Sequence, residues 1–272
     1  MTNKTTLTFL GTGYATATRC YNTCFYLKSH DDSLLVDAGG GNQILNQLER
    51  AGIALTDIHH LYLTHAHTDH VLGAVWVLRL VMQQMRKGSY DGVLHVYGHD
   101  KVLHVLQWIC RETLPGKLTA LIGERVLMHE LKSGDDFEVG SMRFKVFDIL
   151  STKEKQFGFR AELSDGRVIA CLGDEPYNAA THDEVAGADW LLSEAFCLYA
   201  DRERFKPYEK HHSTARDAAL LAGELGVKNL VLYHTEDFSL ATRKATYTAE
   251  ASSVYHGRVF VPDDLETIEI DD

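Results

Sequence analysis

The stretch LTHAHTDH, residues 63–70, carries three histidines and an aspartate within six consecutive positions. With 15 histidines in 272 residues, a chance match to the pattern H-x-H-x-D-H is improbable. Imidazole nitrogens and carboxylate oxygens are the ligands that zinc and similar first-row ions prefer. We therefore interpret His65, His67, Asp69 and His70 as candidate metal ligands, with a histidine-rich surface loop as the alternative.

The segments on either side of this stretch support a metal site. IHHLYL (58–63) is typical of a short buried strand, and VLGAVWVLRLVMQQM (71–85) is typical of a strongly apolar helix. The candidate ligands then lie on the connection between them. A strand end followed by a helix start is a rigid place for a site, and a helix N-terminus favours anionic ligands such as hydroxide or phosphate.

Composition indicates a soluble globular protein. The chain has 45% hydrophobic and 24% charged residues, and no apolar run approaches the length of a membrane span, about 20 residues. Four prolines and the lack of a Gly/Ser-rich stretch leave no obvious linker, so we expect one domain over residues 1–272. The start lacks the apolar core of a signal peptide, which favours a cytoplasmic location. The five cysteines include no C-x-x-C pair, and we expect mostly reduced core thiols.

The net charge of −11 argues against broad electrostatic binding of nucleic acid, although a local basic patch remains compatible with it. The two candidates for such a patch are RKG (86–88) and DRERFKPYEKHH (201–212). The second has charges of both signs. Solvated loop charge is the simpler interpretation of both.

Hydrophobic patterning predicts strands and helices in alternation in both halves of the chain. The expected strands are 6–13, 24–29, 33–39, 58–63, 93–98, 189–196 and 227–234, and the expected helices are 41–51, 71–85, 101–112 and 214–226. Hairpin-like strands fill residues 126–172, with SDGR (164–167) as a turn. This order suggests two sheets packed face to face with helices outside.

Two later strands end in residues that could bind metal. RVIACLGD (167–174) ends in Gly173 and Asp174; glycine allows a sharp turn, and the carboxylate could bridge two ions. NLVLYH (229–234) ends in His234. Taken separately, Asp174 could instead cap the next segment, and His234 could be a hydrogen-bonded, half-buried imidazole.

Together these motifs resemble the metallo-β-lactamase superfamily, and most specifically its ribonuclease Z-like branch. The motifs that carry the resemblance, over nearly the whole chain, are LTFLGTG (7–13), LLVDAGGG (34–41), LTHAHTDH (63–70), GFR (158–160), CLGD (171–174), LLSEAF (191–196), HSTARDAALLA (212–222) and LVLYHTED (230–237). The resemblance implies an α/β fold, the αββα four-layer sandwich of two mixed β-sheets with helices outside, and a dinuclear metal site between its halves. Members of the branch hydrolyse phosphodiesters, and ribonuclease Z cuts the 3′ trailer from precursor tRNA.

The resemblance also implies roles for matched residues. The implied metal ligands are His65 and His67 for the first ion, Asp69, His70 and His234 for the second, and Asp174 as the bridge. Asp69 and His212 are the implied catalytic residues, with His212 placed to assist departure of the leaving oxygen. Its neighbour His211 is better interpreted as a solvent-facing loop residue. Asp37, which follows LLV, is better interpreted as support for the metal loop than as a ligand.

The chain departs from the family pattern in two ways. Members usually carry another metal-binding histidine just upstream of the GFR-like segment, whereas this chain has no histidine between His129 and His182. Water or a side chain such as Ser151 or Thr152 would have to fill that gap, so we expect the first metal position to be only partly occupied. The second departure is that residues 151–174 have room for a hairpin but not for a tRNA-binding arm.

The sequence therefore predicts a hydrolase with two divalent metal ions, in which a metal-bridging hydroxide attacks a phosphodiester. Zinc is the default ion, and manganese or iron also suits the ligand set. The substrate remains open between RNA, a cyclic nucleotide and a small phosphodiester; no membrane partner is expected, and a homodimer is compatible with the sequence. The alternatives are a hydrolase of carboxyl esters, thioesters or lactams, a non-catalytic metal-binding relative with a degenerate first site and, less favoured, an oxygen-reducing di-iron protein.

Overall fold

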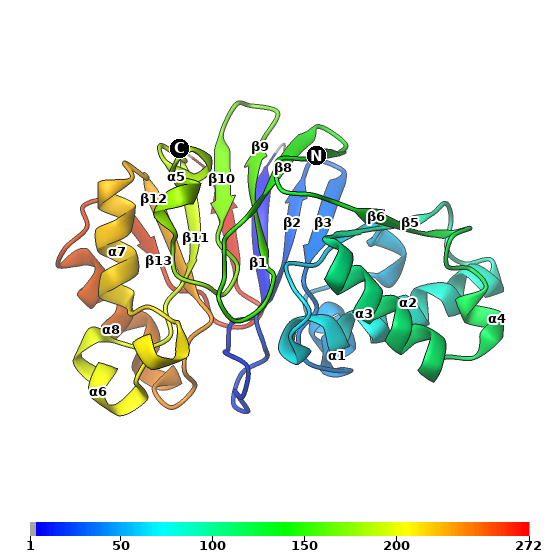
Figure 1. The fold of residues 1–272 in the computed structure, drawn as a ribbon, viewed down its shortest axis with the longest axis horizontal. Helices are drawn as coiled ribbons and strands as arrows, with labels where there is room; N and C mark the ends of the chain where they lie inside the picture. Colours follow the sequence, from blue (N-terminus) through cyan, green and yellow to red (C-terminus); the bar gives the residue numbers. More distant parts are fainter. Residues whose placement is uncertain (1–3, 272) are drawn as a thin grey trace. The chain divides into compact units, whose positions relative to one another are not determined.

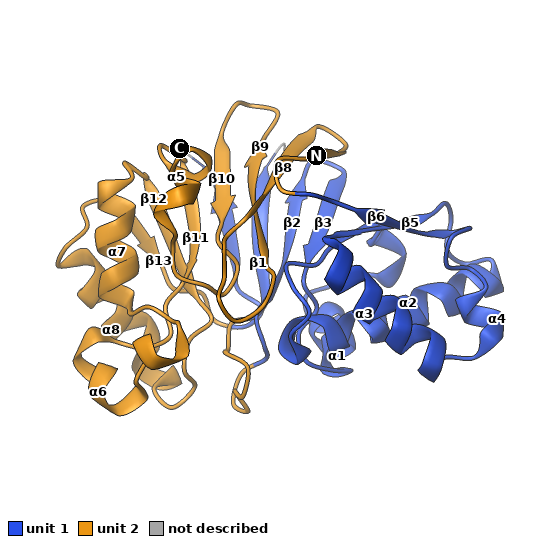
Figure 2. Ribbon diagram, in the orientation of Figure 1, with its two compact units in different colours: residues 1–11, 21–132, 264–272 blue, residues 12–20, 133–263 orange. Residues whose placement is uncertain are grey.

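The computed structural model describes residues 4–271, which form two compact units (Figure 2). The first unit comprises the chain up to residue 11, residues 21–132 and the chain from residue 264 onward. The second unit comprises residues 12–20 and 133–263. Each unit contains one seven-stranded sheet. The expectation of a single domain stays a prediction.

The sheet of the first unit is mixed. Its strands, in spatial order, are β14 (Thr267–Ile270), β1 (Thr5–Gly11), β2 (Cys24–Ser29), β3 (Asp32–Val36), β4 (His60–Tyr62), β5 (Leu94–Gly98) and β6 (Val126–Glu130). The strands from β14 to β3 pair antiparallel, and those from β3 to β6 pair parallel. The helices of this unit are α1 (Gln43–Arg50), α2 (Thr68–Lys87), α3 (Asp100–Thr113) and α4 (Gly116–Thr119).

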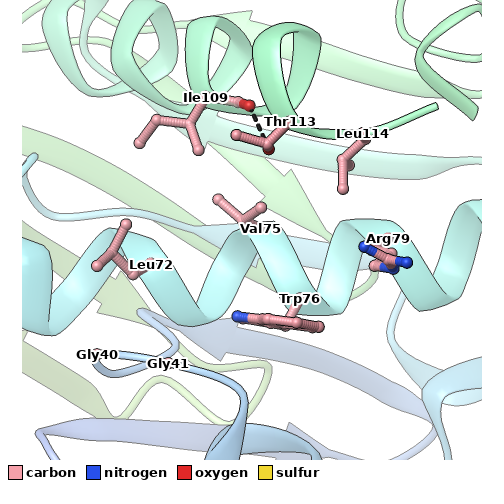
Figure 3. A pocket seen from close by; sticks show the side chains of 9 residues that line it. All are labelled: Gly40, Gly41, Leu72, Val75, Trp76, Arg79, Ile109, Thr113 and Leu114. Atoms are coloured by element: carbon pink, nitrogen blue, oxygen red, sulfur yellow. Dashed lines mark hydrogen bonds between the residues drawn. The ribbon is translucent and has the colours of Figure 1, made fainter. Parts of the chain in front are cut away.

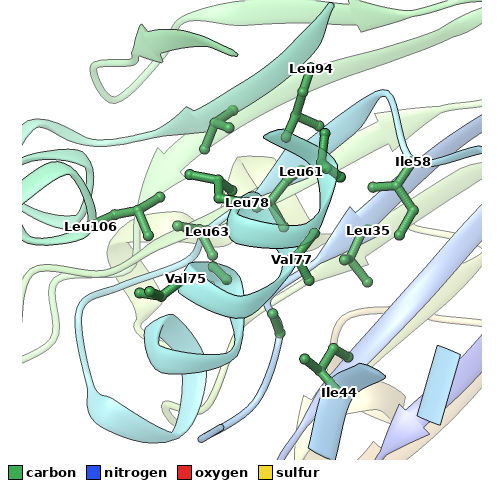
Figure 4. Close-up of a cluster of buried hydrophobic side chains, with 14 of the residues drawn as sticks. Leu35, Ile44, Ile58, Leu61, Leu63, Val75, Val77, Leu78, Leu94 and Leu106 are labelled. Carbon is green, nitrogen blue, oxygen red and sulfur yellow. The ribbon is translucent and has the colours of Figure 1, made fainter. Parts of the chain in front are cut away.

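Helix α2 forms the centre of the core of the first unit. Val77 and Leu78 are fully buried and lie in one cluster with Leu35 of β3 and Leu61 of β4 (Figure 4). Burial of each such side chain stabilises the fold by about 1.5–3 kcal/mol. The first turn of α2, which carries Asp69 and His70, therefore belongs to a helix that is anchored in the core.

The second unit contains the other mixed sheet. Its strands, in spatial order, are β13 (Arg258–Phe260), β12 (Asn229–Tyr233), β11 (Trp190–Glu194), β10 (Val168–Cys171), β9 (Phe157–Glu162), β8 (Met142–Asp148) and β7 (Asp136–Val139). The strands from β13 to β10 pair parallel, and those from β10 to β7 pair antiparallel. The helices are α5 (His182–Val185), α6 (Arg202–Phe205), α7 (Ala215–Glu224) and α8 (Leu240–Ser252).

Helix α7 packs against this sheet through small residues (Figure 1). Ala215, Ala218 and Ala222 are buried, and short side chains let the helix axis approach β11 and β12 closely. A capping box of Thr214 and Asp217 begins the helix and satisfies its first backbone N–H groups. The two residues just before this cap are His212 and Ser213.

Most of the predicted elements are present in the structure, with three differences. The first strand of the stretch predicted as hairpin-like, β6, pairs parallel with β5 in the sheet of the first unit, so the antiparallel strands begin only at β7. Helix α2 begins at Thr68 rather than at residue 71, so Asp69 and His70 lie in its first turn instead of on the connection. The sequence pattern did not predict α8, β13, β14 or the four-residue helices α4, α5 and α6, because Thr- and Ala-rich helices, one-turn helices and short edge strands carry weak periodicity. The predicted turn at 164–167 joins β9 to β10, with Gly166 at φ 85°.

Within the described residues no disulfide links the five cysteines, and four of them are buried, as expected for reduced core thiols. Within residues 4–271, no helix is long and apolar enough to cross a membrane.

Candidate metal centre and catalytic residues

The metal loop of the first unit runs from the end of β4 into α2. His65 is fully buried, and its Nε2 lies 2.8 Å from Nδ1 of the partly buried His67. The two imidazoles thus direct nitrogen atoms toward one point, as two ligands of a single ion require. Asp69 and His70 follow within one helical turn, and Asp69 Oδ2 lies 3.2 Å from His70 Nε2.

Asp37, directly after β3, holds this loop in place. Its carboxylate accepts hydrogen bonds from the Thr64 backbone N–H at 2.9 Å and from the Thr64 hydroxyl at 2.7 Å. The same carboxylate lies 2.7 Å from His70 Nδ1. A proton on Nδ1 that is donated to Asp37 leaves the lone pair of Nε2 for a metal ion, so Asp37 selects the ligating tautomer. This geometry agrees with the supporting role predicted for Asp37.

The loop after β3 and the start of α2 are joined through their backbones. Ala38 N–H donates to the His70 carbonyl at 3.1 Å, and Gly73 N–H donates to the Gly39 carbonyl at 2.8 Å. A Cβ atom at position 73 would collide with the Ala38 carbonyl oxygen, so this contact requires glycine. Asp37 itself has φ 54°, a left-handed conformation that aspartate tolerates better than most residues.

The carboxylates determine the charge of His70. Burial by itself lowers the pKa of this imidazole, but Asp69 and Asp37 together outweigh burial and raise the pKa well above its usual value. A metal ion that binds Nε2 therefore competes with a strongly held proton, and binding releases that proton. The buried His/Asp donor set suits zinc and similar divalent ions.

The second unit brings Asp174 and His234 together. His234 Nε2 lies 3.6 Å from Asp174 Oδ2, and both side chains are buried. Gly173 has φ 68°, so the sharp turn predicted before Asp174 is present, and its carbonyl accepts a hydrogen bond from the Tyr233 hydroxyl at 2.6 Å. His234 has φ 56°, a left-handed conformation that is uncommon for residues other than glycine but that histidine adopts more readily than most.

His212 is paired with a buried carboxylate. Its Nδ1 lies 3.4 Å from Oε2 of Glu194, the last residue of β11, which is fully buried. The other oxygen of Glu194 accepts a hydrogen bond from the Ser213 backbone N–H at 2.5 Å. Glu194 therefore orients the imidazole ring and fixes the chain beside it. The rings of His212 and His234 lie 5.4 Å apart.

The same carboxylate also influences the protonation of His212. Burial lowers the pKa of His212, but the interaction with Glu194 outweighs burial, and the pKa is raised above its usual value. The imidazole thus holds its proton more firmly near neutral pH than a solvated histidine does. A positioned, protonated imidazole can donate to a leaving oxygen.

The segment without the family histidine is anchored beside Asp174. Ser151 Oγ donates to Glu175 at 2.8 Å, and Lys153 Nζ lies 3.0 Å from the same carboxylate. Thr152 Oγ1 lies 3.3 Å from His211 Nδ1. Of the two side chains suggested as replacements for the histidine, Ser151 thus contacts the residue that follows Asp174, whereas Thr152 contacts the exposed His211.

An apolar pocket of about 280 Å³ lies along α2 in the first unit (Figure 3). Leu72, Val75 and Trp76 line it from α2, Ile109 from α3, and the loop at 40–41 from the β3 side. Arg79 is the sole charged side chain in its lining, and none of the candidate metal ligands belongs to it. The pocket therefore supplies no groups for acid–base or metal chemistry.

The structure places all seven candidate site residues in two groups, one in each unit. His65, His67, Asp69 and His70 gather in the first unit, and Asp174, His212 and His234 gather in the second. Sequence reasoning gave no role to Glu194 or Glu175. A buried acid at the end of a strand, as in LLSEAF, is the signal that could have identified Glu194.

The chain is similar to known proteins in sequence and in fold. The chain is 28% identical to ribonuclease Z from Myxococcus xanthus, with 97% of each chain covered, and 26% identical to ribonuclease Z from Haloferax volcanii, with 97% and 94% covered. Its fold is similar to the metallo-β-lactamase fold protein YhfI from Bacillus subtilis (TM-score 0.79, 19% identity, 98% and 99% covered). It is also similar to the short form of human tRNase Z (TM-score 0.75, 21% identity, 98% and 100% covered).

These findings confirm the predicted fold class and the predicted resemblance to the ribonuclease Z-like branch of the metallo-β-lactamase superfamily. Within this class, the family model described as Anti-Pycsar protein Apyc1 matches residues 5–250, and the chain belongs to that family.

Proposed function

We propose that this protein is a phosphodiesterase that uses two divalent metal ions. The observation that carries the proposal is the pairing of His212 with the fully buried Glu194, in the same unit as Asp174 and His234. Phosphodiester cleavage produces an alkoxide that leaves faster when it is protonated, and a carboxylate-held imidazole supplies that proton.

The proposal assigns a chemical role to each of the candidate residues. The proposed metal ligands are His65, His67, Asp69, His70, Asp174 and His234. The bound ions would supply hydroxide at neutral pH and neutralise charge on the phosphoryl oxygens. Asp37 holds His70 in the ligating tautomer. His212 donates the proton on its Nε2 to the leaving oxygen, while its Nδ1 remains directed at Glu194.

The proposed first metal position has fewer protein ligands than the second. His65, His67 and Asp174 are assigned to it, whereas Asp69, His70, His234 and Asp174 are assigned to the second position. Fewer ligands weaken binding, so we infer that the first ion is the more labile.

A turnover assay tests the proposal. The purified protein is expected to hydrolyse bis(p-nitrophenyl) phosphate, to lose this activity with EDTA, and to regain it with zinc or manganese; metal content is measured in parallel by mass spectrometry. A folded, metal-replete sample that hydrolyses a lactam, a thioester or a carboxyl ester instead would establish the alternative hydrolase. A metal-replete sample with none of these activities would establish a non-catalytic relative.

A further inference from the structure

Aromatic and cationic side chains of the second unit form a continuous strip that begins at His212. We name it the stacking strip; its members are Phe196, Phe205, Phe238, Arg19, Arg204 and Lys210. The charge pattern of residues 201–212 did not predict this strip, because its charges of both signs favour a solvated loop. In the folded unit, however, Arg204 and Lys210 of that segment lie over aromatic rings.

The aromatic rings of the strip contact one another in sequence, beginning at His212. The Phe196 ring stacks on His212 with centroids 5.2 Å apart and an interplanar angle of 27°. Phe205 meets Phe196 edge-on at 5.9 Å, and Phe238 lies 6.0 Å beyond Phe205. Phe196 is buried, whereas 53% of Phe238 is exposed. The strip therefore connects the proposed proton donor to an aromatic ring at the surface.

A cation accompanies every ring of the strip. Lys210 Nζ lies 4.9 Å from the centre of the Phe196 ring. The Arg204 guanidinium lies 4.8 Å from Phe205 and 5.4 Å from Phe238, and the Arg19 guanidinium lies 5.3 Å from Phe238. Both arginines are exposed, on a chain whose net charge is −11. The exposed end of the strip thus offers two guanidinium groups to an approaching anion.

Buried carboxylates hold the exposed end of the strip in place. Asp237 accepts hydrogen bonds from the backbone N–H groups of Thr18 at 2.7 Å and Arg19 at 2.9 Å. Glu236 accepts one from the Phe238 backbone N–H at 2.6 Å. Both acids are almost fully buried. The backbone of two segments that are distant in sequence is therefore held so that Arg19 and Phe238 remain adjacent.

We propose that Phe238, Arg19 and Arg204 form a subsite for an unpaired nucleobase and its phosphate, a ligand class that rests on the proposed phosphodiesterase function. Phenyl rings and guanidinium planes both stack on bases, and every base offers a π-face. Guanidinium groups also bind phosphate oxygens. The subsite gives a nucleotide-containing substrate a contact that a phosphodiester without a base lacks. The source of the base is a free nucleotide or a single-stranded oligonucleotide.

Fluorescence anisotropy with the protein as purified tests the stacking contact. The probe is a labelled uridine hexanucleotide with phosphorothioate linkages, which resist hydrolysis. Phe238→Ala is expected to weaken binding by roughly 5- to 150-fold, the usual loss for one stacked base. The matched control is Trp108→Ala, which removes another exposed aromatic side chain, on α3 of the first unit. Melting temperatures of both variants exclude unfolding as the cause.

The salt dependence of binding tests the arginines. Arg19→Gln and Arg204→Gln are each expected to reduce the slope of log Kd against log salt by about 0.7, the value for one phosphate contact on a single strand. Arg143→Gln, an exposed arginine on β8, is the control and leaves the slope unchanged.

Competition distinguishes the two sources of the base. Displacement of the probe by uridine monophosphate identifies free nucleotides as ligands, and displacement by unlabelled oligonucleotide alone identifies a single strand. The inference is overturned if Phe238→Ala binds the probe as tightly as the control, or if inorganic polyphosphate displaces the probe as well as the oligonucleotide does. Hydrolysis of bis(p-nitrophenyl) phosphate without probe binding refutes the subsite alone. Probe binding without any hydrolysis refutes the proposed function alone.

Discussion

Two histidine-rich regions of the first unit differ in the chemical groups that contact their imidazole rings. In the metal loop, the His70 ring lies between the carboxylates of Asp37 and Asp69, which raise its pKa well above the usual value. The second region consists of histidines 60, 95 and 129 on β4, β5 and β6, and we name it the stacked cluster. Its rings stack on one another and on Tyr97.

The stacked cluster places imidazole next to imidazole. The His60 and His95 rings are 5.2 Å apart at an angle of 11°, and His95 Nδ1 lies 2.8 Å from His129 Nε2. Burial, reinforced by the neighbouring histidines, lowers the pKa of His60 to about 4 and also lowers those of His95 and His129. Neutral rings can share a proton and stack, whereas charged rings at these distances repel.

The difference teaches that a buried carboxylate, rather than the number of histidines, distinguishes the two regions. A carboxylate that accepts the Nδ1 proton of a histidine leaves Nε2 available for a metal ion, which is the role we propose for Asp37 beside His70. His212 with Glu194 follows the same rule in the second unit. The predictions below test this rule in order of decreasing effect.

His212→Ala is expected to lower the turnover of a model phosphodiester by roughly 10²–10⁴, the usual contribution of a positioned acid or base. Its metal content is expected to remain that of the wild-type protein, because His212 belongs to no proposed ligand set. Steady-state kinetics and metal analysis measure the two effects.

The matched control is His211→Ala, which removes the neighbouring exposed histidine and leaves the rate nearly unchanged. Loss of bound metal from the His212→Ala variant would indicate that His212 is a metal ligand and would contradict its assignment as a proton donor.

Asp37→Asn is expected to lower metal affinity by about 10- to 100-fold, the usual cost of removing a partner of a ligating histidine. Asparagine tolerates the left-handed backbone of position 37, so the loop keeps its shape while its carboxylate charge is lost. Titration with zinc against a competing chelator measures the affinity. Asp32→Asn, at the start of β3, is the control; equal losses from both variants would refute a specific role for Asp37.

Ser151→His is expected to increase metal occupancy by a smaller, severalfold factor, because it supplies the imidazole that the first position lacks. The variant gives up the hydrogen bond from Ser151 to Glu175, which limits the gain. Equilibrium dialysis at limiting zinc measures occupancy. Ser164→His, in the turn between β9 and β10, is the control, and the same gain from both variants would indicate adventitious binding at an added histidine.

The stacked cluster is expected to affect only acid stability, the smallest of these effects. The pKa of folded His60 is about 4 and that of the unfolded residue about 6.5. As pH falls below 6.5 the unfolded chain takes up the proton first, so the stabilising contribution present above pH 6.5 is lost as pH falls toward 4. Asp32 opposes part of this shift, while His59, His95 and His129 add to it.

Urea unfolding between pH 7.5 and 4.5 measures this loss. His60→Gln is expected to make the midpoint less dependent on pH in this window, with metal content at pH 7.5 unchanged. A fall in metal content would show that the stacked cluster also binds metal and would remove the contrast between the two regions.

Much of the fold could be predicted from local patterns. Strands β2 and β5 and helix α3 end within one residue of their predicted bounds because alternation and helical periodicity are strong there. The start of α2 could not be located, because Thr68 and Asp69 are polar and carry no periodic signal. The boundaries of the two compact units could not be located either, since no linker composition marks them.

The sequence by itself determined which side chains end the strands: the loop with His65 and His67 after β4, Asp174 after β10 and His234 after β12. These features are local, so spacing and hydrophobic pattern suffice to find them. Only the tertiary structure decided which carboxylate faces which imidazole and which arginine covers which ring. Asp37 and His70 are 33 residues apart, Glu194 and His212 are 18 apart, and Arg19 and Phe238 are 219 apart. Such pairs form only when separate strands and loops pack, and no local pattern records them.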